Sequence, residues 1–121
     1  MYNVSDEFIK VATEEINDEI TNLENILHFC ATNDDVYQNA NELQKHIHKI
    51  KGLAPMTGKE ELGILSSMLD GILKEMIEGK KNGGIFNILT ESLYYMKNSM
   101  NETNYDLSEI NNKIKQVLSD F

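Results

Sequence analysis

Several residue types that would direct this chain toward other protein classes are absent or rare. The 121 residues contain no tryptophan, one proline and one cysteine. The single cysteine, Cys30, cannot form an internal disulfide, and we expect it to be a small core hydrophobe in a reducing, cytoplasmic compartment. No apolar run reaches the roughly 18 residues of a membrane span. The acidic, polar start MYNVSDEF does not resemble a signal peptide.

Basic charge is also scarce, and it is unevenly distributed. The formal net charge is −9, and residues 1–42 hold ten acidic residues and one lysine. An acidic chain without a basic patch argues against nucleic acids and anionic membranes as partners. The segment HIHKIKGLAPMTG, residues 46–58, is the local exception, because lysines flank and interrupt it at Lys45, Lys49, Lys51 and Lys59.

Apolar residues recur at steps of three and four along almost the whole chain, which predicts helices and no strand. The first expected helix runs from about residue 5 to residue 30, and the second carries the apolar residues from Val36 to Ala54. The third carries apolar residues over 62–76 and ends at Gly79. The fourth covers 86–100, and a shorter fifth covers 107–121. Ser5 is the expected cap of the first helix, and Pro55 should end or kink the second. The length fits a single domain over residues 1–121. The predicted fold is an all-α, antiparallel up-down four-helix bundle with the fifth helix packed against its side.

Two histidines lie two positions apart on the second predicted helix. At about 100° per residue, His48 lies roughly 120° from the apolar seam and should be exposed, whereas His46 lies on the opposite flank. Two ligands on one helix need a spacing of three or four residues, so this pair cannot chelate one metal ion. No Glu-x-x-His pair suggests a metal centre inside the bundle.

His48 has neighbours that suit a phosphoryl acceptor. A neutral imidazole nitrogen is a nucleophile for phosphoryl groups, and Lys51, one turn on, can balance phosphate charge. Gly52 removes a side chain that would obstruct a partner, although glycine costs roughly 1 kcal/mol of helix propensity. Taken alone, an exposed His-Lys-Gly run is more often an ordinary helix surface, and both interpretations remain open on these residues.

A longer spacing pattern extends from this histidine into the third predicted helix. It resembles the signature of histidine phosphotransfer (HPt) domains and runs His48-x-x-Lys51-Gly52-x-Ala54-x-x-x-Gly58-x-x-x-Leu62. The helix order, the acidic first helix and the run LGILSSMLDGILKEMIEGK are similar to the N-terminal phosphotransfer domain of CheA-type chemotaxis histidine kinases. The resemblance covers nearly the whole chain.

The resemblance implies a role for each matching residue. His48 would accept the phosphoryl group through Nε2, with Lys51 as the supporting cation and Gly52 as the clearance residue. The family carries an acidic residue at the position of Asp70, which would accept a hydrogen bond from Nδ1–H of His48 and so fix the tautomer. The alternative for Asp70 is an ordinary solvated carboxylate.

The sequence departs from the family at three positions. The family commonly has glutamate where Asp70 stands, often has histidine at Ser67, and often has glycine or another small residue at Pro55. We therefore expect a longer or water-bridged contact to His48, a smaller polar network and a shortened or bent helix. His46 does not match the motif and is interpreted as a flank residue, and His28 as a complement to a helix dipole. Methionines and tyrosines of the later helices should fill the core.

The function implied by the resemblance is that of a phosphoryl carrier in two-component, chemotaxis-type signalling. A histidine kinase catalytic domain, using ATP and Mg²⁺, would phosphorylate His48, and a response-regulator receiver domain would then take the group onto an aspartate. The chain has no glycine-rich nucleotide loop of its own, so we expect no cofactor in this domain and no independent catalytic site. The alternatives are a stand-alone phosphorelay shuttle and a helical interaction module without phosphotransfer.

Overall fold

The computed structural model describes residues 5–121, and over this range the protein contains helices and no strand. The helices are α1 (Asp6–His28), α2 (Asn33–Gln38), α3 (Ala40–Leu53), the short 3₁₀ turn η1 (Pro55–Thr57), α4 (Glu60–Ile77), α5 (Ile85–Asn101) and α6 (Ser108–Ser119). The prediction of an all-helical chain is confirmed. None of the described helices is both long enough and apolar enough to cross a membrane.

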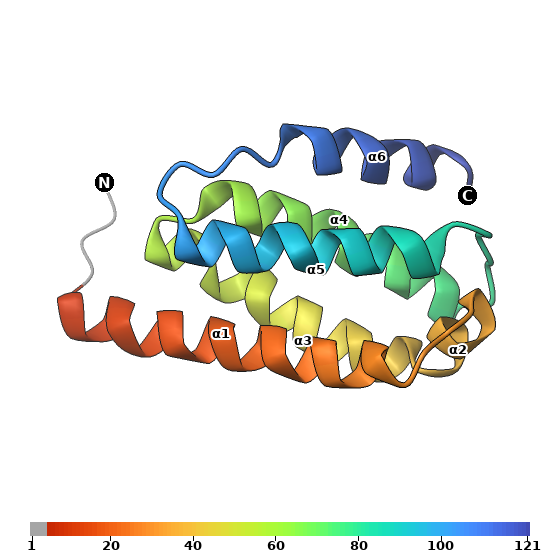
Figure 1. Cartoon of the computed structure of the whole chain (residues 1–121), viewed down its shortest axis with the longest axis horizontal. Coiled ribbons are helices and arrows are strands. Elements are labelled where there is room, and N and C mark those ends of the chain that lie inside the picture. The colour runs from red at the N-terminus through yellow and green to blue at the C-terminus, as the bar shows by residue number, and fades with distance from the viewer. Residues whose placement is uncertain (1–4) are drawn as a thin grey trace.

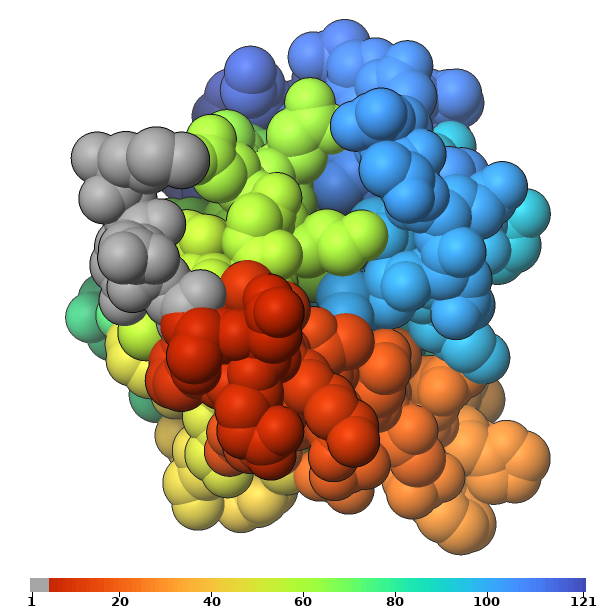
Figure 2. Space-filling model, turned by 90° about the vertical axis from the view of Figure 1, so that its left-hand side faces the viewer, coloured from red at the N-terminus to blue at the C-terminus, as the bar shows by residue number. Residues whose placement is uncertain are grey.

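The helices form a bundle in which the long elements pack against one another (Figure 1). α3 packs most extensively against α4 and next against α1, and α5 contacts both α1 and α4. α6 packs against α4 and α5, and the end-on view of Figure 2 shows it on the far side of the molecule from α1. The last helix therefore lies along α4 and α5.

The core follows the apolar stripes that the sequence shows. The largest side chains that are fully enclosed come from α1, α3, α4 and α5 and recur at helical spacing, namely Ile16, Leu23, Leu43, Ile47, Ile50, Leu62, Leu65, Leu69, Ile72, Leu73, Ile85 and Leu89. Met96 is also fully buried, but Tyr94 is 63% exposed, so the expectation that tyrosines fill the core is wrong for this residue. Tyr94 follows Leu93 on α5, and the step of about 100° turns it away from the core stripe.

The segment expected to form one second helix is instead two helices that meet at Asn39. Its backbone angles, φ −104° and ψ 10°, depart from the α-helix, and its side-chain amide donates to the carbonyl of Asp35 at 2.8 Å. Local bonding of this kind competes with helix continuation. Thr32 caps the start of α2 through a reciprocal capping box with Asp35. The apolar stripe continues from Val36 to Ala40 without a change of spacing. The spacing of apolar residues therefore does not reveal that the helix is interrupted at Asn39.

The first predicted helix is shorter than expected at its C-terminal end. Ser5 caps α1 as predicted, by accepting from the backbone N–H of Phe8, but the helix ends at His28 rather than Cys30. Cys30 is nevertheless buried, as expected of a core hydrophobe. Burial, together with the negative charge of Asp35, raises the pKa of its thiol and so favours the neutral form.

Pro55 ends α3, as predicted, and brings the start of α4 close to the end of α3. The chain turns through η1 and closes at Gly58, whose φ of +81° is a left-handed conformation that favours glycine. A Cβ added to Gly63 of α4 would lie 3.0 Å from Cγ of Pro55, so the proline ring packs directly on this glycine. This contact helps to set α3 and α4 side by side, which positions the candidate site.

Candidate functional site

His48 lies on the exposed side of α3, next to α4. The apolar residues of α3 turn inward to the core, with Leu43, Ile47 and Ile50 almost completely buried. The His48 side chain is 58% exposed, as the helical wheel predicts. Its Nδ1 atom lies 3.3 Å from Oδ2 of Asp70 on α4, a length that agrees with the longer contact expected from aspartate.

Asp70 is buried and surrounded by hydrogen-bond donors. Only 1% of its side chain is exposed, so it is not the solvated carboxylate of the alternative interpretation. Its Oδ2 atom is approached by His48, by Lys51 at 3.2 Å and by Lys74 at 3.1 Å. Its Oδ1 atom accepts from Nε2 of Gln44 at 2.8 Å. These contacts bring His48 and Lys51 together around one carboxylate.

The contacts around Asp70 determine its charge and, through it, the tautomer of His48. Burial acts to raise the pKa of Asp70, but hydrogen bonds from Gln44, Lys74, His48 and Lys51 outweigh it and lower this pKa to about 2. The carboxylate is therefore ionised at neutral pH and can only accept hydrogen bonds. The ring nitrogen that faces it must carry the proton, which leaves Nε2 of a neutral His48 with a free lone pair.

Gly52 leaves open space beside His48. It lies in the last turn of α3 and is exposed, and no heavy atom lies within 4 Å of the position that its Cβ would occupy. Packing within the described chain therefore does not require glycine here.

Two partners of Asp70, Gln44 and Lys74, were not predicted from the sequence. Both have a local signal in hindsight, because Gln44 lies four residues before His48 and Lys74 lies four residues after Asp70. Ser67 is exposed on α4. Ser67 takes no part in the contacts to Asp70, whereas Gln44 and Lys74 supply two donors.

His46 lies apart from this cluster, on the flank of α3 that faces α1. Its Nδ1 atom lies 2.6 Å from Oε2 of Glu19, a carboxylate whose side chain is 8% exposed, and Lys49 approaches the same carboxylate at 3.7 Å. The His46 side chain is itself only 18% exposed. This pair joins α1 to α3.

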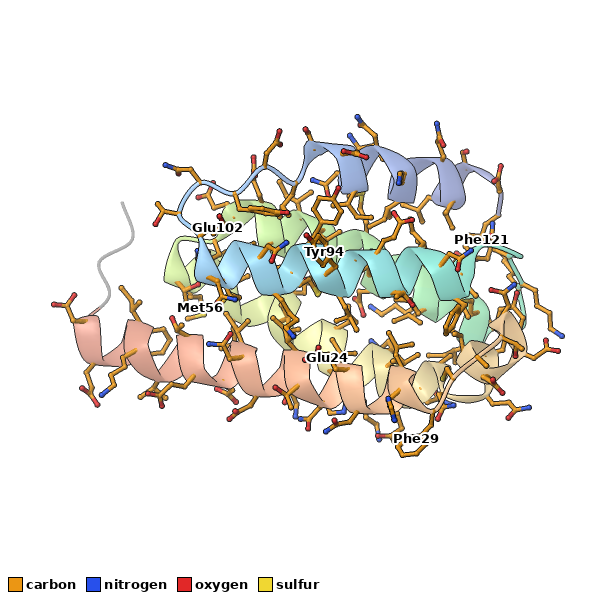
Figure 3. The ribbon with its side chains drawn as sticks, in the orientation of Figure 1. Glu24, Phe29, Met56, Tyr94, Glu102 and Phe121 are labelled. Atoms are coloured by element: carbon orange, nitrogen blue, oxygen red, sulfur yellow. The ribbon has the colours of Figure 1, made fainter. Side chains whose placement is uncertain are left out.

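Two hollows of the described surface lie away from His48. One, of about 590 Å³, lies between α1 and α5 and is lined in part by Glu24 and Tyr94, which Figure 3 labels. The other, of about 490 Å³, lies where α4 begins and α5 ends, and Glu102 contributes to its lining. Neither hollow includes a residue of the His48–Asp70 cluster. His48 itself lies on the exposed surface.

No family model matches the chain, and neither a curated protein nor a solved structure matches it.

The charge on Asp70 should make folding stability depend on acidity in a defined range. The ordinary pKa of this carboxyl is 3.8, and it falls to about 2 in the folded protein. A depressed folded pKa contributes stability above the unfolded value, and this contribution is lost as the pH falls from about 4 to about 2, with a size of roughly 2 kcal/mol. Chemical denaturation of the parent and of Asp70→Asn at several pH values measures it. We expect the variant to be less stable at neutral pH and to lose less on acidification across this range. Equal losses in the two proteins would contradict the assignment.

Proposed function

We propose that this protein is a histidine phosphotransfer domain that carries a phosphoryl group on Nε2 of His48 in two-component signalling, as the domain it resembles does in CheA-type chemotaxis kinases. The observation that carries the proposal is the pairing of an exposed imidazole with a buried, ionised carboxylate at 3.3 Å. The arrangement of α1, α3, α4 and α5 with α6 at the side supports the bundle with an appended helix that this role implies.

The reaction follows from the tautomer of His48. Nε2 attacks the γ-phosphorus of ATP held by a separate kinase domain with Mg²⁺, a P–N bond forms, and the bond to the departing ADP oxygen breaks. The phosphorylated ring keeps its proton on Nδ1 and carries positive charge, which Asp70 stabilises. Lys51 is close enough to this cluster to turn toward the new phosphoryl charge.

The second half of the reaction returns the ring to its starting state. An aspartate of a receiver domain attacks the phosphorus, the P–N bond breaks, and Nε2 recovers its lone pair. The domain itself is therefore a substrate and a donor, while the kinase and the receiver supply catalysis. Because the donor is ATP, we place this chemistry in the cytoplasm.

The partner surface is the exposed face of α3 and α4 around His48. Both the kinase and the receiver need their reactive groups within bonding distance of Nε2, so both must approach the same face in turn. The open space at Gly52 lets a partner backbone come near the ring. A modest, reversible interface suits two partners that bind alternately.

The test is phosphoryl transfer in trans. The domain is mixed with the catalytic core of a chemotaxis-type histidine kinase and γ-labelled ATP, and a known phosphotransfer domain serves as the control for kinase activity. We expect acid-labile, base-stable label on this protein, and loss of that label when a receiver domain is added. An unlabelled protein beside a labelled control, with no back-transfer from phosphorylated receivers, would overturn the proposal in favour of an interaction module.

A further inference from the structure

The two oxygens of Asp70 have unequal surroundings. Oδ2 is shared by three donors, from His48, Lys51 and Lys74, at 3.1–3.3 Å. Oδ1 accepts from Gln44, and this contact, at 2.8 Å, is the shortest of the four. The orientation of the carboxylate therefore depends on Gln44 for one oxygen and on three competing donors for the other.

The lysines are poor candidates for fixing this orientation. The side chains of Lys51 and Lys74 are 38% and 53% exposed, and each ammonium group lies at the end of a flexible four-carbon stem. The terminal torsion of an aspartate is itself broad, so the carboxylate plane turns easily unless it is held. If the carboxylate plane of Asp70 turned, Oδ2 could move toward Lys51 or Lys74 and lose its 3.3 Å contact to Nδ1 of His48.

Gln44 is placed to prevent that rotation. It lies four residues before His48, so the two side chains share one face of α3 and reach α4 about one turn apart. Gln44 holds Oδ1 and His48 meets Oδ2, so α3 contacts the carboxylate at both oxygens. Aspartate has one methylene fewer than glutamate, so a carboxylate that has turned away from His48 cannot restore the contact by extending its side chain.

We infer that Gln44 is a positioning residue for the phosphoryl acceptor: it fixes the plane of the Asp70 carboxylate so that Oδ2 faces Nδ1 of His48 and the ring keeps Nε2 unprotonated. The expected effect of Gln44 on phosphoryl acceptance rests on the proposed function, but its effect on the tautomer of His48 does not.

The test is nitrogen NMR of the histidine rings in the full chain, at a pH where His48 is neutral. We expect the parent to hold the proton of His48 mainly on Nδ1, and Gln44→Leu to shift a large share of it to Nε2. The matched control is Gln116→Leu, the same change at an exposed position of α6, which should leave the tautomer as it is in the parent. Gln44→Met keeps the length of the side chain and removes the donor without adding a charge beside Asp70, so it should shift the tautomer in the same direction if the leucine variant folds poorly.

A second readout separates positioning from plain stabilisation. Removal of a group that orients a reactive side chain typically costs 10–100-fold, so we expect labelling of His48 to slow by roughly tenfold in Gln44→Leu. A lower melting temperature with an unchanged tautomer would assign Gln44 a structural role only and overturn the inference. A shifted tautomer in a protein whose parent accepts no phosphoryl group would instead support the positioning and refute the proposed function.

Discussion

Replacing His48 with glutamine is expected to reduce phosphoryl acceptance by at least a hundredfold, to the background of the labelling assay. Glutamine keeps the polarity and much of the size of the side chain, and its amide can still donate to Asp70. It has no nucleophilic ring nitrogen, so it removes the acceptor while leaving the surroundings in place. The measurement is the initial rate of label incorporation from a kinase core and γ-labelled ATP, at equal concentrations of parent and variant.

His46→Gln is the matched control for this experiment, because His46 lies on the same helix two residues away and also places Nδ1 against a carboxylate. The two rings differ in access, with 18% of the His46 side chain exposed against 58% for His48. We expect His46→Gln to incorporate label within about twofold of the parent, since its pair with Glu19 acts on packing. Label that persists in His48→Gln and disappears in His46→Gln would move the acceptor to the other flank of α3.

The variant that loses phosphoryl acceptance should be the more stable of the two. We expect His48→Gln to unfold much like the parent and His46→Gln to be less stable than the parent. His48 is exposed, so His48→Gln should change the free energy of unfolding by roughly 0.5 kcal/mol or less. His46 and Glu19 form a short contact between largely enclosed side chains, so weakening that contact in His46→Gln should cost about 0.5–1.5 kcal/mol, the net contribution of a typical hydrogen bond. Denaturation curves of the two variants therefore check that a loss of labelling in His48→Gln is chemical and not a consequence of unfolding.

The features that the sequence predicts well are those with local causes. Apolar residues three and four apart define the core stripes, and the structure buries them as expected at Ile16, Leu43 and Leu65. Ser5 and Pro55 act on the backbone within a few residues of themselves, so the start of α1 and the end of α3 are also predictable. The break at Asn39 is local as well, but the apolar stripe runs through it without a change of spacing.

The polar contacts of the site were only partly predictable, for a different reason. The expectation that Asp70 meets His48 came from the family resemblance, and wheel geometry alone places Asp70 only at the edge of a seam. Gln44 and Lys74 join the cluster because α3 and α4 pack with a particular rotation about their axes, which apolar spacing does not specify. Glu19 and His46 pair for the same reason across α1 and α3. Long-range polar partners depend on this rotation, and the sequence pattern alone does not supply it.

Substitutions at Gly52 should affect folding stability and phosphoryl transfer differently. Because a Cβ at this position would meet no heavy atom within 4 Å, Gly52→Ala is expected to stabilise the fold. The gain should be about 0.5–1 kcal/mol, from the lower backbone entropy of the unfolded chain and the higher helix propensity of alanine. Gly71→Ala on α4, where a Cβ also meets nothing, is the control for this stability effect and should give a similar gain. Urea denaturation of the three proteins measures it.

Gly52→Gln should leave the fold intact and impair transfer severely. A long side chain beside His48 occupies the space through which a receiver backbone approaches, and displacing a reacting group by about 1 Å can cost on the order of 10²-fold in rate. We expect transfer from phosphorylated His48 to a receiver to slow by about that factor, with Gly52→Ala intermediate. Spontaneous hydrolysis of the phosphohistidine, which needs no partner, should proceed at the parental rate in all three proteins and so reports on the ring alone. If Gly52→Gln transfers at the parental rate, partners approach His48 from the α4 side. Gly52 would then have no role in docking.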